Sequence, residues 1–207
     1  MTAAALEHDS AHPAEEHRTS LPINSRKLAM WTFIGSECLL FASLITTFVI
    51  YRNSHATGPG PKDVFEVPLV TGGTAVLLFS SFFIVMALNG AQAGDRKKLL
   101  TWLSLTVLCG MFFVGMQVYE FTGFMHKGMG YSTNLFATSF FTLTGFHGTH
   151  VAIGTLWNIT LLKDAYKGRI PPQKALNLEI AALYWHFVDV VWIIIFPVVY
   201  LMSLFAK

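Results

Sequence analysis

Five long apolar runs constrain this 207-residue chain more than any other feature of its sequence. The runs cover about residues 28–51, 67–90, 100–124, 134–162 and 178–205. Each run exceeds the roughly 20 residues that a helix needs to cross the hydrocarbon core of a bilayer. The strands of a membrane β-barrel would instead alternate apolar and polar residues in segments of about ten. The pattern therefore predicts an all-α, polytopic membrane protein with five transmembrane helices.

The composition also indicates a membrane protein without a separate soluble domain. Hydrophobic residues make up 53% of the chain and charged residues only 13%, whereas a soluble domain carries about 25% charged residues. The first 27 residues are polar and lack the apolar core of a cleavable signal peptide. We therefore expect a polar N-terminal tail over residues 1–27, followed by one transmembrane domain over residues 28–207.

The basic residues predict how the helices are oriented. Ten of the 14 Lys and Arg residues lie in the N-terminal tail and in the second and fourth loops. Because cytoplasmic segments carry an excess of Lys and Arg, we expect a cytoplasmic N-terminus and, after five spans, a C-terminus outside. The net charge of +2 is therefore explained mainly by the basic residues of the predicted cytoplasmic segments. Nucleic-acid binding would need a basic face on a soluble surface, so we expect no nucleic-acid partner.

Carboxyl and imidazole side chains inside the apolar runs are the candidate functional groups. Such groups are costly at bilayer depth, so they usually face a protein interior and pair with one another. At a rise of about 1.5 Å per residue, most of them fall in the middle of the bilayer. The candidates for proton handling or buried polar contacts are Glu37, Glu120, His147, His150, His186 and Asp189.

Two of the runs carry polar residues at helical spacing. His147 and His150 are three residues apart in the fourth run. His186 and Asp189 have the same spacing in the fifth run. Because residues three apart share a helix face, we expect each helix to present a compact polar pair. We also expect Asp189→Leu to disturb helix association, since it would leave His186 or a donor on another helix unpaired.

The histidines at depth raise the question of bound haem or copper. A catalytic haem–copper core needs more histidine ligands than the three that this chain places in the membrane. A dicopper centre would need closely spaced cysteines, but Cys38 and Cys109 lie in different runs and form no C-x-x-C pair. The tail histidines His8, His12 and His17 are expected to be solvated. We therefore predict no metal site and no cofactor in this chain.

Glu37 is an isolated carboxyl group in an apolar helix, and two roles remain open for it. It is a candidate proton carrier, because carboxyl groups at bilayer depth often belong to proton pathways. It is also a candidate for a neutral carboxyl held by hydrogen bonds to a neighbouring His or Thr. Small residues beside it, Gly35 and Ser36, are explained by close helix packing alone.

Tyrosine and tryptophan residues lie near several predicted span ends. Amphipathic rings of this kind favour the membrane–water interface, so we interpret them as an aromatic belt. The set comprises Trp31, Tyr51, Tyr119, Tyr131, Tyr184 and Tyr200.

Three motifs stand out, at residues 184–192 with the sequence YWHFVDVVW, at residues 144–151 and at residues 36–41. All three resemble motifs of subunit III of the haem–copper terminal oxidases, and residues 184–192 are similar to the signature of that family's last helix. Residues 144–151 resemble its G-F-H-G-x-H-V element, and residues 36–41 its S-E-x-x-x-F element. Further matches, in family order, lie at residues 65–69, 94–97 and 119–120. The chain looks like the shorter five-helix bacterial form of the subunit.

The resemblance implies a particular architecture and particular site residues. It implies helices in two groups, separated by a cleft that holds structural phospholipid, with the first group completed by another subunit. The residues that would line this lipid cleft are Trp31, Glu37, Trp185 and His186. Glu37 matches the family's membrane-embedded carboxylate that reacts with carbodiimides.

The resemblance also implies a function in aerobic respiration. The chain would be a non-redox subunit of a proton-pumping oxidase that reduces oxygen to water in the bacterial plasma membrane. It would pack directly against subunit I, which holds haem and copper, with subunits II and IV as further partners. It would support proton uptake, lipid binding and the stability of the catalytic subunit.

The electron donor and two alternative functions remain open on the sequence. Residues 145–148 and 94–97 look more like the cytochrome c branch, so we expect cytochrome c as donor, bound only through the complex. A quinol oxidase is the alternative. An independent proton-coupled transporter using Glu37 and Asp189 would be expected to show repeated halves or broken helices, which the sequence lacks. A purely structural, lipid-binding assembly subunit overlaps the first hypothesis.

Overall fold

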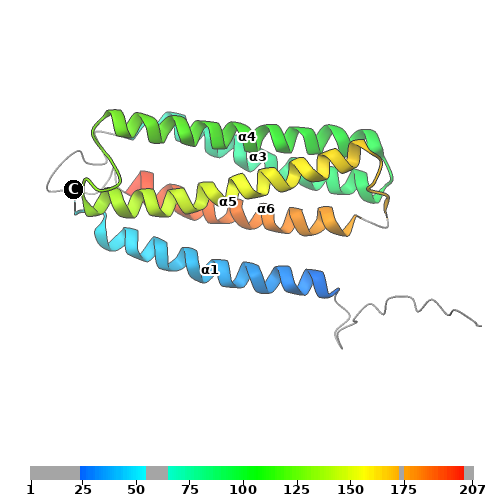
Figure 1. Cartoon of the computed structure of the whole chain (residues 1–207), viewed down its shortest axis with the longest axis horizontal. Coiled ribbons are helices and arrows are strands. Elements are labelled where there is room, and N and C mark those ends of the chain that lie inside the picture. The colour runs from blue at the N-terminus through cyan, green and yellow to red at the C-terminus, as the bar shows by residue number, and fades with distance from the viewer. Residues whose placement is uncertain (1–23, 55–64, 173–174, 203–207) are drawn as a thin grey trace, which may run out of the picture.

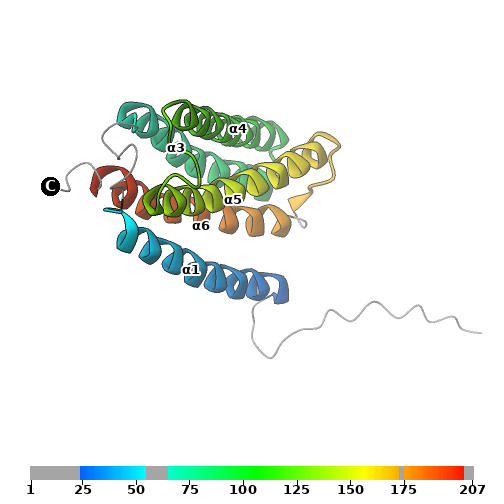
Figure 2. The same ribbon diagram turned by 60° about the vertical axis from the view of Figure 1, so that its left-hand side comes forward.

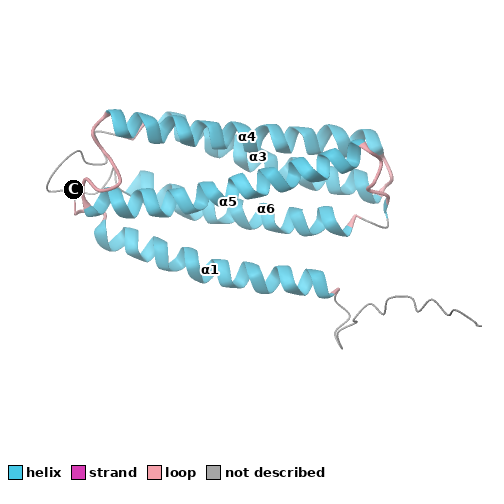
Figure 3. Ribbon diagram, in the orientation of Figure 1, coloured by secondary structure: helices cyan, strands magenta, loops and turns pink. Residues whose placement is uncertain are grey.

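The computed structural model describes residues 24–54, 65–172 and 175–202, and these residues form helices and connecting turns without any strand (Figure 3). The helices are α1 (Ser25–Tyr51), α3 (Val67–Gln92), α4 (Arg96–His126), α5 (Leu135–Tyr166) and α6 (Leu176–Phe196), followed by the π-helix η2 (Pro197–Leu201). The all-α class and the five helical segments are thereby confirmed. Because α1 begins at Ser25, the last residues of the expected tail are helical; residues 1–23 lie outside the described part of the chain.

Four of the described helical segments are long and apolar enough to cross a membrane. They are α1, α3, α4 and the continuous segment Leu176–Leu201 formed by α6 and η2. α5 has sufficient length, with 32 residues, but His147, His150 and Asn158 lower its mean hydropathy. The fifth span therefore stays a prediction. α5 carries several buried polar side chains, among them His147, Thr155 and Asn158.

The helices lie roughly along one long axis, and α1 stands on one side of the others. α3, α4, α5 and α6 each contact two neighbours and close into a four-helix bundle. α1 packs against α5 and α6, which lie between it and the α3–α4 side in both views (Figures 1 and 2). Among the side chains of α1, only Phe41 and Phe48 are fully buried. Most of the α1 surface thus faces away from the bundle.

Local signals explain where the helices begin and end. Side-chain oxygens accept hydrogen bonds from backbone N–H groups in the first turns of α1, α4 and α5, as is typical of N-caps. The capping residues are Asn24, Asp95 and Asn134. Glycines in the left-handed region, which costs a side chain-bearing residue free energy, terminate α3, α4 and α5. They are Gly94 (φ 72°), Gly128 (φ 83°) and Gly168 (φ 69°).

Small residues allow α4, α5 and α6 to meet around one large ring. The indole of Trp185 on α6 is fully buried. A Cβ atom added to Gly154 on α5 would lie 2.9 Å from two ring carbons of Trp185, and one added to Gly110 on α4 would lie 2.9 Å from Trp185 Cη2. Both glycines are therefore required by packing, because protein interiors are too dense to accommodate an extra methyl group at these distances.

Candidate functional site

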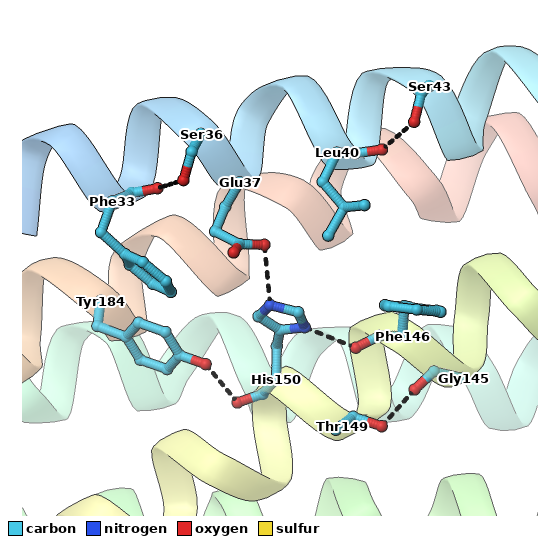
Figure 4. Close-up of polar contacts among 10 residues, drawn as sticks. All are labelled: Phe33, Ser36, Glu37, Leu40, Ser43, Gly145, Phe146, Thr149, His150 and Tyr184. Atoms are coloured by element: carbon cyan, nitrogen blue, oxygen red, sulfur yellow. Dashed lines mark hydrogen bonds and ion pairs between the residues drawn. The ribbon is translucent and has the colours of Figure 1, made fainter.

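A carboxyl–imidazole pair joins α1 to α5 near the middle of both helices. His150 Nε2 lies 3.2 Å from Glu37 Oε2, and the two side chains point toward one another (Figure 4). The side chains are largely shielded, with 13% of His150 and 16% of Glu37 exposed. Polar groups at membrane depth are expected to find such partners. The structure thus brings together two of the six predicted candidates, from helices more than 100 residues apart in sequence.

The hydrogen bonds of His150 fix how many protons the pair holds. His150 Nδ1 lies 2.7 Å from the carbonyl oxygen of Phe146, and a carbonyl only accepts, so Nδ1 carries a hydrogen. Nε2 then either accepts from a protonated Glu37 or donates to its carboxylate. Each arrangement places one proton between the two atoms and leaves the pair without net charge. A proton can therefore move across the contact without leaving a net charge in the membrane.

Aromatic side chains from α1 and α6 enclose this pair. The hydroxyl of Tyr184 donates to the backbone oxygen of His150 at 3.1 Å. Phe33 stacks on Tyr184 with ring centroids 6.3 Å apart, and Phe41 packs edge-on against His150 at 5.1 Å. Tyr184 was interpreted from the sequence as part of an aromatic belt, but it is buried and supports the site. The position of Tyr184 two residues before His186, within the YWHFVDVVW motif, is the sequence feature that could have indicated its place beside the buried polar residues.

His147 occupies a different environment from His150. It is fully buried, and its ring stacks on Trp192 with centroids 4.7 Å apart, while Phe113 meets it edge-on at 6.0 Å. Neither ring nitrogen has a hydrogen-bond partner within the described residues. The expected compact pair is therefore divided, because residues three apart point about 60° away from each other around a helix. One histidine reaches α1, and the other faces the aromatic core.

Two tryptophans of α6 are bonded to hydroxyl groups of α3. Trp185 Nε1 donates to Ser80 Oγ and Trp192 Nε1 donates to Thr74 Oγ1, each at 2.9 Å. Both indoles are buried. Trp185, which we expected to line a lipid cleft, is completely enclosed by the chain itself and is not available to lipid there. Of the other cleft candidates, Trp31 is 56% exposed on α1.

His186 and Asp189 do not pair with each other. His186, which is half-buried, places Nδ1 2.8 Å from the hydroxyl of Ser81 on α3. Asp189 is 3% exposed, and neither of its carboxyl oxygens has a hydrogen-bond partner in the part of the chain that the structure describes. The structure therefore corrects the expectation that Asp189 holds His186. His186 bonds to α3 instead.

The remaining acid, Glu120 on α4, is held by η2. The hydroxyl of Tyr200 lies 3.1 Å from both carboxyl oxygens of Glu120, and both side chains are buried. Tyr200 belongs to the π-helix that begins at Pro197. π-turns are rare and frequently occur at functional positions. Tyr200, like Tyr184, was assigned from the sequence to an interfacial belt and is instead an interior hydrogen-bond donor.

The described residues contain no group of three or more His, Cys, Asp or Glu side chains gathered as metal ligands would be. Cys38 and Cys109 are free cysteines on α1 and α4. The tail histidines His8, His12 and His17 lie outside the described residues.

Comparison with known proteins identifies the family of this chain. The family described as "Cytochrome c oxidase subunit III" matches residues 12–204. Cytochrome c oxidase subunit 3 of Bacillus sp. (strain PS3) is 40% identical over 191 residues, covering 92% of each chain. Quinol oxidase subunit 3 of Bacillus subtilis (strain 168) is 43% identical, covering 86% of this chain and 87% of the relative. Cytochrome bo(3) ubiquinol oxidase subunit 3 of Pseudomonas aeruginosa is 37% identical, covering 95% and 90% respectively. The chain therefore belongs to the cytochrome c oxidase subunit III family.

Proposed function

We propose that this chain is the non-redox subunit III of a proton-pumping terminal oxidase that reduces oxygen to water during aerobic respiration. In this role it lies directly against the catalytic subunit I, with subunits II and IV as further neighbours. Haem and copper would be held by those partner subunits. Family membership supports the oxidase assignment and disfavours an independent proton-coupled transporter.

The observation that carries a role in proton handling is the contact between Glu37 and His150. The contact lies between the central turns of α1 and α5 and is largely shielded from the surface. Because the shared proton can shift between Glu37 and His150 without changing the net charge of the pair, the pair can pass a proton from one side chain to the other at low electrostatic cost. We propose that it relays protons that the catalytic subunit takes up during turnover.

A role in lipid binding follows from the position of α1. α1 has an apolar outward face that the other described helices leave uncovered, including Leu39 (75% exposed), Trp31 and Ile50. We propose that structural phospholipid lies along this outward face of α1, where helices of another subunit complete the first helix group, and that α3 to α6 form the second group. Five membrane spans are part of this proposal.

The orientation proposed for the chain places its N-terminus in the cytoplasm of a bacterial cell. Lys27 at the start of α1 forms a 2.5 Å ion pair with Glu179 at the start of α6, so both helices begin at the same end of the bundle. Arg169, which follows α5, pairs with Asp164 at 3.6 Å. This end carries most of the basic residues, as cytoplasmic ends of membrane helices do.

The decisive experiment is Glu37→Gln in the intact oxidase. The glutamine side chain has nearly the same shape, and its NH₂ group can donate to His150 Nε2, but it cannot exchange the proton. We expect an unchanged haem spectrum and subunit composition, together with fewer protons pumped per electron or a shorter catalytic lifetime. Ser36→Ala, on the exposed face of the same helix, is the matched control. If pumping and lifetime both equal those of the wild type, Glu37 has a structural role only.

The electron donor is proposed to be cytochrome c, on the basis of residues 94–97 and 145–148. Quinol is the second candidate, because a quinol oxidase subunit 3 is 43% identical to this chain. The purified complex should oxidise reduced cytochrome c in preference to a quinol, and its subunit list and optical spectrum should agree. Oxidation of quinol alone would assign the complex to the other branch.

A further inference from the structure

A second polar site lies at the end of the bundle where α3 begins and α4 ends. A cavity of about 280 Å³ opens there, close to the lower limit for small-ligand pockets, which start at about 300 Å³. Its size suits a lipid headgroup better than a larger organic molecule. The cavity is lined by residues from both helix ends, among them Glu66, Leu69, Tyr119, Glu120, His126 and Lys127. It is separate from the Glu37–His150 pair, which lies between α1 and α5.

The cavity presents charges of both signs. At its mouth Lys127 Nζ lies 3.0 Å from Glu66 Oε1, and these side chains are 40% and 55% exposed. Glu120 contributes a second carboxyl group from deeper inside, where it is only 6% exposed. A ligand that carries only one sign of charge would meet a like charge in this cavity. A zwitterion can place each of its charges beside an opposite one.

Glu66 and Lys127 each lie at a helix end of opposite polarity. Glu66 is the N-cap residue of α3, and its side chain caps no backbone N–H. Lys127 directly follows His126, the last residue of α4. Because anionic side chains are favoured at helix N-termini and cationic ones at C-termini, the two helix dipoles stabilise both charges at the mouth of the cavity.

The position of the cavity points to a lipid. α3 and α4 are both candidate membrane spans, so their ends lie in the headgroup region of a bilayer. Tyr119 lines the cavity and is 67% exposed, and the exposed apolar residues Phe112 and Leu108 follow it at helical spacing along α4. An acyl chain can follow this surface while the headgroup occupies the cavity.

We propose that this cavity binds the headgroup of a zwitterionic phospholipid with a primary ammonium group, as in phosphatidylethanolamine. The phosphate lies beside Lys127, and the ammonium group donates to the carboxyl groups of Glu66 and Glu120. Charge-assisted hydrogen bonds of this kind are stronger than neutral ones. Phosphatidylcholine has no N–H to donate, and phosphatidylglycerol has no positive charge, so both bind less well.

The test is lipid binding to the intact, delipidated oxidase, measured by native mass spectrometry. The probes are phosphatidylethanolamine, phosphatidylcholine and phosphatidylglycerol with identical acyl chains. We expect phosphatidylethanolamine to bind best. Glu66→Gln should weaken its binding about fivefold while leaving phosphatidylglycerol unaffected or tighter, and Lys127→Gln should weaken both. Lys167→Gln, exposed at the other end of the bundle, is the matched control and should change none of them.

A further experiment distinguishes binding of a membrane lipid from binding of a free headgroup. Water-soluble glycerophosphoethanolamine should displace phosphatidylethanolamine only at far higher concentration, because it lacks the acyl chains. Tight binding of this soluble compound alone would overturn the lipid assignment. Equal binding of the three lipids to the wild type, or unchanged selectivity in Glu66→Gln, would overturn the headgroup assignment. Both substituted residues are partly exposed, and unchanged retention of this subunit in the purified complex verifies that each variant is folded.

Discussion

The indole nitrogen of Trp185 donates a hydrogen bond to Ser80 Oγ, 2.9 Å away, in the interior of the bundle. The same contact recurs further along α6, where Trp192 donates to Thr74. Because the partner numbers fall on α3 as they rise on α6, the two helices are antiparallel. Buried indole N–H groups need an acceptor. The two bonds therefore set the register of α6 against α3.

Ser80→Ala should destabilise the subunit by about 1 kcal/mol, because it leaves the Trp185 N–H buried without an acceptor. The effect should be measured as a lower midpoint for thermal loss of this subunit from the purified oxidase. Ser43→Ala is the control, since the Ser43 hydroxyl lies on the exposed face of α1 and donates only to its own helix, at Leu40 O. Equal midpoints for the two variants would show that the indole bond contributes nothing.

Gly154→Ala should impair assembly, whereas Gly145→Ala on the same helix should be tolerated. A Cβ atom at position 154 would lie 2.9 Å from the rigid, buried ring of Trp185, but one at position 145 would meet no atom within 4 Å. Overpacking of this kind costs about 1–3 kcal/mol. The yield of subunit that copurifies with the complex is the readout. Comparable losses in both variants would mean that helix propensity, rather than the ring contact, decides the outcome.

Tyr200→Phe should destabilise the end of the bundle at which η2 meets α4. The phenylalanine keeps the ring contacts but leaves the buried Glu120 carboxyl without its donor, at a cost of about 1–3 kcal/mol. Tyr131→Phe is the control, because the Tyr131 hydroxyl is exposed and lies 3.3 Å from Thr142. The measurement is the temperature at which this subunit dissociates from the complex, compared between Tyr200→Phe and Tyr131→Phe. The interpretation fails if Tyr200→Phe has no larger effect than Tyr131→Phe.

His147→Phe and His150→Phe should have opposite consequences. Phenylalanine at 147 preserves the stack on Trp192 and removes two buried nitrogens that have no partner within the described residues, so stability should be equal or higher. Phenylalanine at 150 removes the partner of the shielded Glu37 and should lower stability and pumping together. Thermal midpoints and proton stoichiometry of the two variants provide the measurement. A loss caused by His147→Phe as large as that caused by His150→Phe would contradict this account.

The helices were predictable because length and apolarity are local properties of the chain. Within the described residues all five runs are helical, and differences at the ends follow from caps. Asp95 starts α4 several residues before the expected position, and Gly168 allows α5 to continue to Tyr166. The loop with Gly58–Pro61 lies outside the described residues. Local sequence signals therefore locate the helices well.

The partners of the polar residues were not predictable, because they depend on how helices cross. The sequence marks Glu37 and His150 as candidates, but only the packing of α1 on α5 shows that they meet while His147 turns to Trp192. The expectation that Asp189→Leu would leave His186 or a donor on another helix unpaired was based on helical spacing alone. His186 contacts Ser81 instead, so loss of its partner is no longer a reason to expect weaker helix association.

The change from α6 to a π-turn at Pro197 has a consequence for sequence spacing. A π-turn accommodates an additional residue per turn, so the phenol of Tyr200 reaches α4 only at this particular distance from Trp192. Removing one residue between Pro197 and Tyr200 would restore the usual pitch and rotate the phenol away from Glu120. At this end of the helix, an insertion or deletion should be less tolerable than many substitutions, because the count of residues, as much as their identity, determines which side chains meet.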